Sequence, residues 1–225
     1  MIKKLVGFGC SWIQGDEIEH PTEQPGSRRH RLYREKNCTL GQLGKLLGAK
    51  RVENYGISGG SLQSTQWEFL KWAQSVDDYS DTMVVVGLTE SSRTSWWNGP
   101  NKNKSQFGGK YMHNHLVYPG HPWEDFVKFH YVNSDDDELR VINYRQTVLL
   151  IHNHCSVNNI PLFIFNVFPS PYATKMVTHP SWNARGYMHR LDSEGQPVLA
   201  PGKHPNEHGS RLLAEKLYSM VNSNA

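Results

Sequence analysis

The stretch Phe8-Gly9-Cys10-Ser11-Trp12 decides the expected fold, because the first apolar run of the chain, Ile2 to Phe8, ends there in a glycine-flanked turn. A turn at the end of a strand exposes both the hydroxyl of its serine and the backbone N–H beside it. Near the other end of the chain, His204 opens the segment His204-Pro205-Asn206-Glu207-His208-Gly209, just before an expected helix. Ser11 and His204 are therefore our candidate nucleophile and base.

Two further glycine-containing turns lie between these ends. They are Asn54-Tyr55-Gly56-Ile57-Ser58-Gly59-Gly60 and Gly87-Leu88-Thr89-Glu90-Ser91, and each follows another apolar run. The order of the four turns resembles the SGNH or GDSL hydrolase superfamily, whose blocks are a Gly-Asp-Ser turn, an oxyanion-glycine turn, a Gly-x-Asn-Asp turn and an Asp-x-x-His turn before the last helix. The chain also looks like uncharacterised SGNH-type proteins encoded by bacteriophages.

This resemblance assigns roles to single residues. Ser11 and His204 match the nucleophile and the base, while the N–H groups of Ser11 and Gly59 and the side chain of Thr89 match the oxyanion hole. The chain departs from the pattern at three positions: Cys10 replaces Asp, Thr89 replaces Asn, and Pro201 replaces the Asp that precedes the histidine by three residues. We interpret Cys10 as a buried structural thiol, because neighbouring side chains of an extended backbone point to opposite sides.

The missing Asp leaves open how His204 is oriented. A main-chain carbonyl near Pro201 or Gly202 would give a Ser-His dyad, and a carboxylate from elsewhere, with Asp192 as the candidate, would complete a triad. His208 is a second candidate base, but it is expected to lie one turn inside the last helix.

The apolar runs are short, rich in Val, Ile and Phe, and not alternating, which is typical of parallel strands buried on both faces. They span Lys4 to Phe8, Arg51 to Tyr55, Thr82 to Gly87 and Ile160 to Val167, with a weak fifth candidate at Gln196 to Ala200. Helices are expected at Thr39 to Leu47, Ser61 to Ser75, Asp136 to Asn158 and Pro205 to Val221. This alternation predicts an α/β fold: a three-layer α/β/α sandwich with a doubly wound, mostly parallel sheet. The resemblance implies the flavodoxin-like strand order 2-1-3-4-5, and ligands bind such sheets at the carboxyl ends of the strands.

Two long segments, about 91–135 and 168–203, do not fit this alternation. Both follow strand ends on the expected site side, so we predict that they are insertions that wall the pocket. Glu90, Arg93, Trp96 and Trp97 are candidate substrate-binding residues near the start of the first segment. A satellite core beneath a long loop is an equal alternative for the aromatic residues.

The length favours a single domain over residues 1–225. The three cysteines favour a reducing compartment, because they are an odd number and lack the spacing of metal ligands. The N-terminal run is interpreted as a strand and not as a signal peptide, and no run is long enough to span a bilayer. We therefore expect a cytoplasmic protein, or a virion-associated one if it is phage-encoded. A formal charge of +3 is small, and the basic cluster Arg28-Arg29-His30-Arg31 is interpreted as a solvated loop, so no nucleic-acid partner is predicted.

The predicted function is hydrolysis of a short-chain acyl ester, such as an O-acetyl group on a carbohydrate, by a Ser-His acyl-enzyme route without cofactor or metal. Two alternatives remain. The fold could be retained as a catalytically weakened binding or structural module, for example of a virion. Gly56-Ile57-Ser58-Gly59-Gly60 also matches the Gly-x-Ser-x-Gly elbow of α/β-hydrolases, which would make Ser58 the nucleophile. The partner is a small-molecule or glycan ester, and the oligomeric state is left open.

Overall fold

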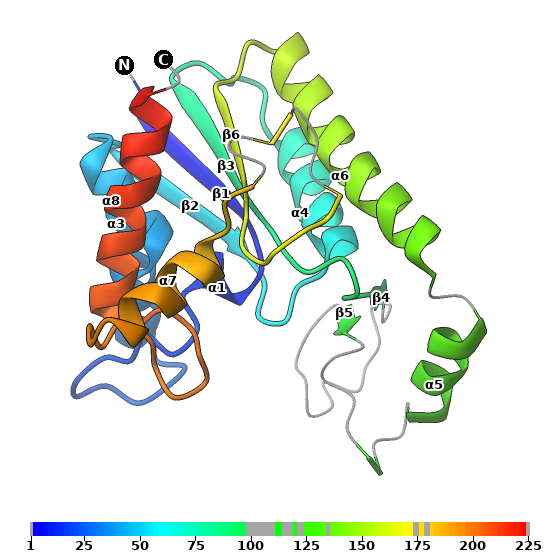
Figure 1. The fold of residues 1–225 in the computed structure, drawn as a ribbon. Coiled ribbons are helices and arrows are strands. Elements are labelled where there is room, and N and C mark those ends of the chain that lie inside the picture. Colours follow the sequence, from blue (N-terminus) through cyan, green and yellow to red (C-terminus); the bar gives the residue numbers. More distant parts are fainter. Residues whose placement is uncertain are drawn as a thin grey trace.

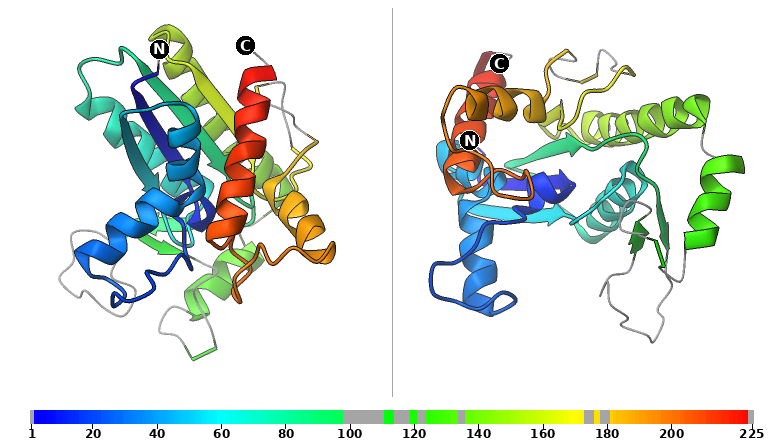
Figure 2. Two further views of the ribbon diagram at one scale, coloured as in Figure 1. Left: turned by 90° about the vertical axis from the view of Figure 1, so that its left-hand side faces the viewer. Right: turned by 60° about the horizontal axis from the view of Figure 1, so that its bottom comes forward.

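A four-stranded parallel sheet forms the centre of the molecule. The computed structural model describes residues 2–97, 111–113, 119–120, 124–133, 136–172, 176–177 and 181–223. Within them the strands lie in the order β2–β1–β3–β6. Their bounds are Lys4–Gly9 (β1), Arg51–Gly56 (β2), Thr82–Leu88 (β3) and Leu162–Asn166 (β6). Helices lie on both faces of the sheet (Figure 1, Figure 2), which confirms the predicted three-layer α/β/α fold.

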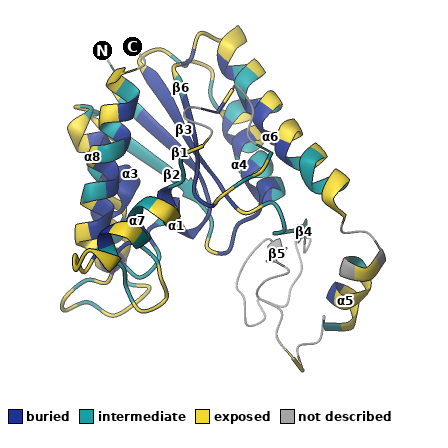
Figure 3. Cartoon of the chain, viewed as in Figure 1, coloured by how far each residue is buried: buried dark blue, intermediate teal, exposed yellow. Residues whose placement is uncertain are grey.

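Both faces of the sheet are apolar because successive strand residues point to opposite sides. Leu5 belongs to the core under α3 (Thr39–Leu46) and α8 (Glu207–Ser223), whereas its neighbour Val6 belongs to the core under α4 (Leu62–Ser75) and α6 (Asp137–Val157). Every residue of β3 is buried. Strands β1, β3 and β6 are accordingly mostly dark blue in Figure 3, whereas the edge strand β2 is only partly buried and is teal. This two-sided burial explains the unbroken apolar runs in the sequence.

The four main strands and four long helices begin and end within two residues of the predicted ranges. Their ends carry the expected signals. Ser61 caps α4 in a reciprocal capping box with Ser64, Asp136 caps α6, and Gly48, with φ 69°, follows the end of α3.

The interpretation of Arg28-Arg29-His30-Arg31 as a loop is wrong, because these residues begin helix α2 (Arg28–Asn37). The N-cap is Ser27, whose hydroxyl accepts the N–H of His30 at 3.0 Å. Only Leu32 and Tyr33 are large and apolar in this helix, so it has no helical pattern of apolar residues. Capping and packing against α3 stabilise it in place of an apolar stripe.

The expected fifth strand at Gln196 to Ala200 is also wrong. Within the described residues, Leu199 forms one isolated antiparallel bridge with Pro205, and β6 is flanked by a single parallel bridge from Asn166 to Asn183. Pro197 and Pro201 lack the N–H groups that a paired strand needs, which explains why no strand forms there.

The two long segments contain structure of their own. The described part of 91–135 holds an antiparallel pair, β4 (Ser95–Trp97) with β5 (Tyr111–His113), and helix α5 (Glu124–Asn133). The segment 168–203 holds α7 (Ala184–Ser193). The elements β4, β5, α5 and α7 lie toward the carboxyl ends of the strands (Figure 1). In the described part of the chain no helix is long and apolar enough to cross a membrane, and no group of three or more His, Cys, Asp or Glu residues could hold a metal ion.

The close contact of α2 with α3 makes a testable prediction at Gly41. A Cβ atom there would lie 2.2 Å from the backbone oxygen of Glu35 and 2.7 Å from that of Lys36. Gly41→Ala should therefore destabilise the protein by about 1–3 kcal/mol, although alanine is the better helix former. Chemical denaturation measures this, with exposed Lys45→Ala on the same helix as a control within about 0.5 kcal/mol. A stabilised Gly41→Ala variant would contradict the observed packing.

Candidate active site

Ser11 lies at the point where the central strand β1 ends. Gly9 has φ 147°, and a Cβ atom there would lie 2.5 Å from the backbone oxygen of Gly87, so only glycine fits between β1 and β3. The chain then forms the one-turn helix α1 (Ser11–Gln14). Ser11 is its first residue and is 3% exposed. Its N–H donates to no acceptor in the described part of the chain, as is usual in the first turn of a helix.

His204 reaches Ser11 from the far end of the sequence. Its Nε2 atom lies 2.9 Å from the Ser11 Oγ, which is a hydrogen-bond distance. The turn before it brings the ring into place: Ala200 N–H donates to the His204 carbonyl at 2.8 Å, and Lys203 adopts the left-handed φ of 66°. The serine and the histidine that were paired from sequence are therefore in contact. His208, the second candidate base, instead lies on α8 with its Nδ1 3.0 Å from Arg211, exposed to solvent.

A carboxylate orients His204, and it belongs to Glu17. The Glu17 Oε2 atom lies 2.8 Å from the His204 Nδ1. The same carboxylate accepts the backbone N–H of Gly202 at 2.7 Å and that of His204 at 3.2 Å. The expectation of a dyad oriented by a main-chain carbonyl is thus wrong, as is Asp192 as the third member. Asp192 lies near the end of α7 and has no contact with His204 among the described residues.

Sequence reasoning missed Glu17 because it expected the acid near His204, three residues before the histidine in the last turn. Its signal was nearer: Asp16 and Glu17 follow Ser11 in the same strand-end turn. What sequence reasoning could not supply is the backbone conformation, since Glu17 has φ 64°. Non-glycine residues in this region are uncommon and cluster at functional sites.

The environment of Glu17 favours its charged form. Partial burial raises the pKa, but the hydrogen bonds from the His204 ring and from the N–H groups of Gly202 and His204 outweigh it and lower the pKa below the ordinary value of 4.5. A carboxyl whose pKa is lowered on folding stabilises the folded state above its unfolded pKa. That contribution is lost as the pH falls through the lowered folded value.

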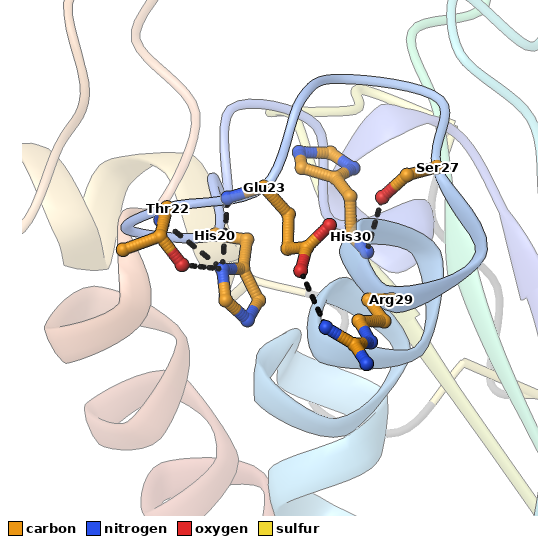
Figure 4. Close-up of polar contacts among 6 residues, drawn as sticks. All are labelled: His20, Thr22, Glu23, Ser27, Arg29 and His30. Carbon is orange, nitrogen blue, oxygen red and sulfur yellow. Dashed lines mark hydrogen bonds and ion pairs between the residues drawn. The ribbon is translucent and has the colours of Figure 1, made fainter.

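The segment that follows Glu17 is folded on itself by polar contacts (Figure 4). The His20 Nδ1 accepts the N–H groups of Thr22 and Glu23, each at 3.2 Å, and Glu23 pairs with Arg29 on α2 at 3.2 Å. The His20 ring also packs edge-on against Tyr33, whose hydroxyl donates to Glu207 on α8. The Glu17 loop is therefore attached to the same helix that follows His204.

The two backbone N–H groups expected as oxyanion donors follow the carboxyl ends of β1 and β2. One is the N–H of Ser11 itself, and the other is that of Gly59. Gly59 is buried with φ 69° in a turn closed by a hydrogen bond from Gly60 N–H to the Ile57 carbonyl at 2.9 Å. Only glycine adopts this φ at low cost. Neither N–H group has an acceptor among the described residues.

The side chain of Thr89, the third expected oxyanion donor, is buried. Thr89 is 3% exposed, and its Oγ1 is covered and without a standard hydrogen bond in the part of the chain that the structure describes. It interacts weakly with the thiol of Cys10, which is fully buried. Burial raises the pKa of Cys10, outweighing the nearby charge of Arg93, so the thiol stays protonated and is not a thiolate nucleophile.

Ser58 is not placed as a nucleophile. Its exposed hydroxyl donates to the Asp16 carboxylate at 2.5 Å, and no histidine bonds to it within the described residues. It also follows β2, which is an edge strand of the sheet. The arrangement contradicts the α/β-hydrolase alternative.

The candidate substrate-binding residues are divided between the site and the first insertion. Arg93 packs over the ring of Phe168 and lies 3.8 Å from the carboxylate of the exposed residue Glu90. Trp96 instead packs against Phe126 and His130 of α5, with ring centroids 5.1 and 5.0 Å away, as a satellite core would. Trp97 lies in β4, but its side chain is outside the described part of the chain.

Comparison with known proteins gives a likeness of fold. No protein-family model and no curated protein sequence matches the chain. Among solved structures, a carbohydrate esterase family 2 enzyme with a carbohydrate-binding domain from Corynascus thermopiles (Myceliophthora fergusii) superposes with a TM-score of 0.50 at 12% identity, over 98% of this chain and 66% of that one. The chain has the fold of this carbohydrate esterase.

Two further solved structures match this chain over nearly the whole length of both chains. A carbohydrate acetylesterase family member from Sinorhizobium meliloti has a TM-score of 0.49 at 13% identity, with 99% of this chain and 98% of that chain covered. A lipolytic G-D-S-L family protein from Veillonella parvula has a TM-score of 0.44 at 16% identity, with 96% of each chain covered.

The contact of Glu17 with His204 predicts a large effect of Glu17→Gln on any ester hydrolysis by this chain. The amide keeps the size but loses the charge that holds the imidazole in its tautomer, so kcat should fall by about 10²- to 10⁴-fold. Asp192→Asn is the matched control and should change kcat by less than about twofold. Steady-state kinetics on 4-nitrophenyl acetate measures both. Equal losses in the two variants would mean that Glu17 has no special role.

For Thr89, whose hydroxyl is covered, we predict only a small effect on catalysis. Thr89→Val removes a buried hydroxyl without a standard partner and keeps the shape, so kcat should change by less than about threefold and stability should stay equal or rise by up to about 1 kcal/mol. Removing an oxyanion donor would instead lower kcat by about 10²- to 10³-fold. Kinetics and thermal unfolding of the same variant decide between the two roles.

Proposed function

We propose that this chain is a serine esterase that uses Ser11 as nucleophile, His204 as general base and Glu17 as the carboxylate that orients the base. The observation that carries the proposal is the continuous chain of contacts of 2.9 Å from Ser11 to His204 and 2.8 Å from His204 to Glu17. Such a chain of nucleophile, base and orienting carboxylate is what activates a serine hydroxyl.

In the first step the Ser11 Oγ attacks the carbonyl carbon of the ester, and the His204 Nε2 takes the hydroxyl proton. The negative charge that develops on the carbonyl oxygen is stabilised by the N–H groups of Ser11 and Gly59. His204 then gives its proton to the departing alkoxide, which leaves as the alcohol, and the acyl group stays on Ser11. Glu17 stabilises the imidazolium that exists between these proton transfers.

In the second step water attacks the acyl-enzyme. His204 takes a proton from the water, the tetrahedral intermediate forms at the same two N–H groups, and the protonated imidazole returns the proton to the Ser11 Oγ. The carboxylic acid is released, and the free serine is restored. Both half-reactions use the same three side chains and need no cofactor.

We take the substrate to be a short acyl ester, such as acetate, on a carbohydrate. Its support is the fold, which this chain shares with an enzyme described as a carbohydrate esterase, together with a nucleophile that lies at the carboxyl ends of the strands, where ligands of open α/β sheets bind. The two chains are 12% identical, and experiments with different esters identify the acyl group and the alcohol of the substrate.

Ser11→Ala tests the proposal directly. It should abolish hydrolysis of 4-nitrophenyl acetate and labelling by a fluorophosphonate, because the attacking oxygen is gone. Ser58→Ala, which alters another serine in a glycine-containing turn, should keep both. Mass spectrometry locates the label. Labelling that persists without Ser11 would contradict the proposal, and a wild-type protein that reacts with neither reagent would favour the binding-module alternative.

A further inference from the structure

Two arginine side chains pack on one aromatic ring next to the candidate nucleophile. The ring belongs to Phe168, the second residue after the end of β6, and this residue is 7% exposed. The guanidinium carbon of Arg93 lies 4.8 Å from the ring centroid, and that of Arg185 lies 5.4 Å from it. Guanidinium groups often stack on aromatic rings in this way, which leaves their N–H edges open for hydrogen bonds.

The backbone fixes both arginines in this place. Arg185 is in the first turn of α7, and its N–H donates to the Val167 carbonyl at 2.8 Å, which fastens the helix to the end of β6. Arg93 follows β3 in a turn closed by its N–H and the Glu90 carbonyl at 3.2 Å. The carboxyl ends of two neighbouring strands therefore supply one arginine each, with the ring between them.

The shared ring and Arg93 interact with the two chain neighbours of Ser11. Phe168 packs edge-on against Trp12, with ring centroids 6.1 Å apart. On the other side of the serine, the positive charge of Arg93 acts on the buried thiol of Cys10. A group bound by the guanidinium edges would thus lie beside an ester held at Ser11.

Within the described part of the chain, neither arginine has a close anionic partner. The Arg93 side chain is only 17% exposed, and its ion pair is a contact of 3.8 Å between Nε and the Glu90 carboxylate, beyond hydrogen-bond length. Arg185 is exposed, and its Nε donates to the Nε2 of His189 at 3.4 Å. Arg93 is therefore a mostly buried cation without a close anion, which is costly, and an anionic ligand would remove that cost.

We infer that Arg93 and Arg185 bind a carboxylate of the substrate, so that the alcohol part of the ester is an acidic sugar such as a uronic acid. This inference rests on the proposed function, since it places the carboxylate next to an ester at Ser11. Arginine suits the role because its planar fork of donors matches the two oxygens of a carboxylate. Glu90 becomes the weak partner that the substrate displaces.

The test compares acetate release from acetylated polygalacturonate and from the same polymer after its carboxyl groups have been reduced. Wild-type protein should prefer the acidic polymer by at least about tenfold in kcat/KM. Arg93→Gln should lower kcat/KM on the acidic polymer by about 10- to 100-fold and Arg185→Gln by about 3- to 10-fold, and each variant should prefer the acidic over the reduced polymer less strongly than the wild type does.

Arg190→Gln is the matched control, because Arg190 also packs over an aromatic ring of α7, that of Tyr187 at 5.6 Å, but lines a separate hollow of about 440 Å³ with Trp182 and Lys216. It should leave the preference unchanged. Equal activity of the wild type on both polymers would overturn the inference, as would an equal effect of Arg190→Gln. Circular dichroism verifies that each variant is folded.

A binding measurement separates this inference from the esterase proposal. Ser11→Ala protein should bind trigalacturonate in calorimetry, and the added Arg93→Gln change should weaken that binding by at least about tenfold. Binding that does not depend on Arg93 overturns the inference even if the ester is hydrolysed. Arg93-dependent binding by a wild-type chain that hydrolyses no ester would support the carboxylate site and refute the esterase.

Discussion

The pairing of β1 with a parallel neighbour on each side is the constraint on which the rest of the site depends. It places Gly9 opposite Gly56 of β2 and Gly87 of β3. These glycines give α1 room to lie directly over the strand ends: a Cβ atom at Gly56 would lie 2.5 Å from the Gln14 nitrogen, and one at Gly87 would lie 2.9 Å from Ile13. A bulkier residue at either position would push α1, and Ser11 with it, away from the sheet.

Glu17 shows how the site is completed without the acid of the last block. Pro201 cannot provide a carboxylate, but the turn that follows it provides two N–H donors, from Gly202 and His204, that hold one. A left-handed conformation at Glu17 costs about 1–2 kcal/mol. Three hydrogen bonds of about 1 kcal/mol each offset that cost. The hydrogen bonds that hold the Glu17 carboxylate against the imidazole thus also offset the conformational cost of the residue.

Sequence patterns predicted the elements whose formation depends on burial. The apolar runs gave the four strands, and the apolar periodicity gave the long helices, because two-sided burial leaves a direct record in residue type. Two predictions were wrong. Residues predicted as a loop form α2, which is stabilised by its N-cap, and the predicted fifth strand does not form because prolines prevent it. The short blocks predicted that Ser11 and His204 pair, and the two side chains are in contact, whereas the contact of Glu17 depends on a left-handed backbone conformation and the Thr89 hydroxyl is covered by its surroundings. Such features follow from the packing of distant segments and not from local pattern.

Ser11 and Glu17 lie six positions apart on one short segment, while His204 comes from the turn that leads into the last helix. Folding of the first strand and its loop therefore assembles two of the three groups, and the third arrives only when α8 docks against α3. The contact between Ser11 and His204 thus exists only while two segments far apart in the sequence are docked together. Under the proposed function, a covalent label on Ser11 would report whether these two segments have come together.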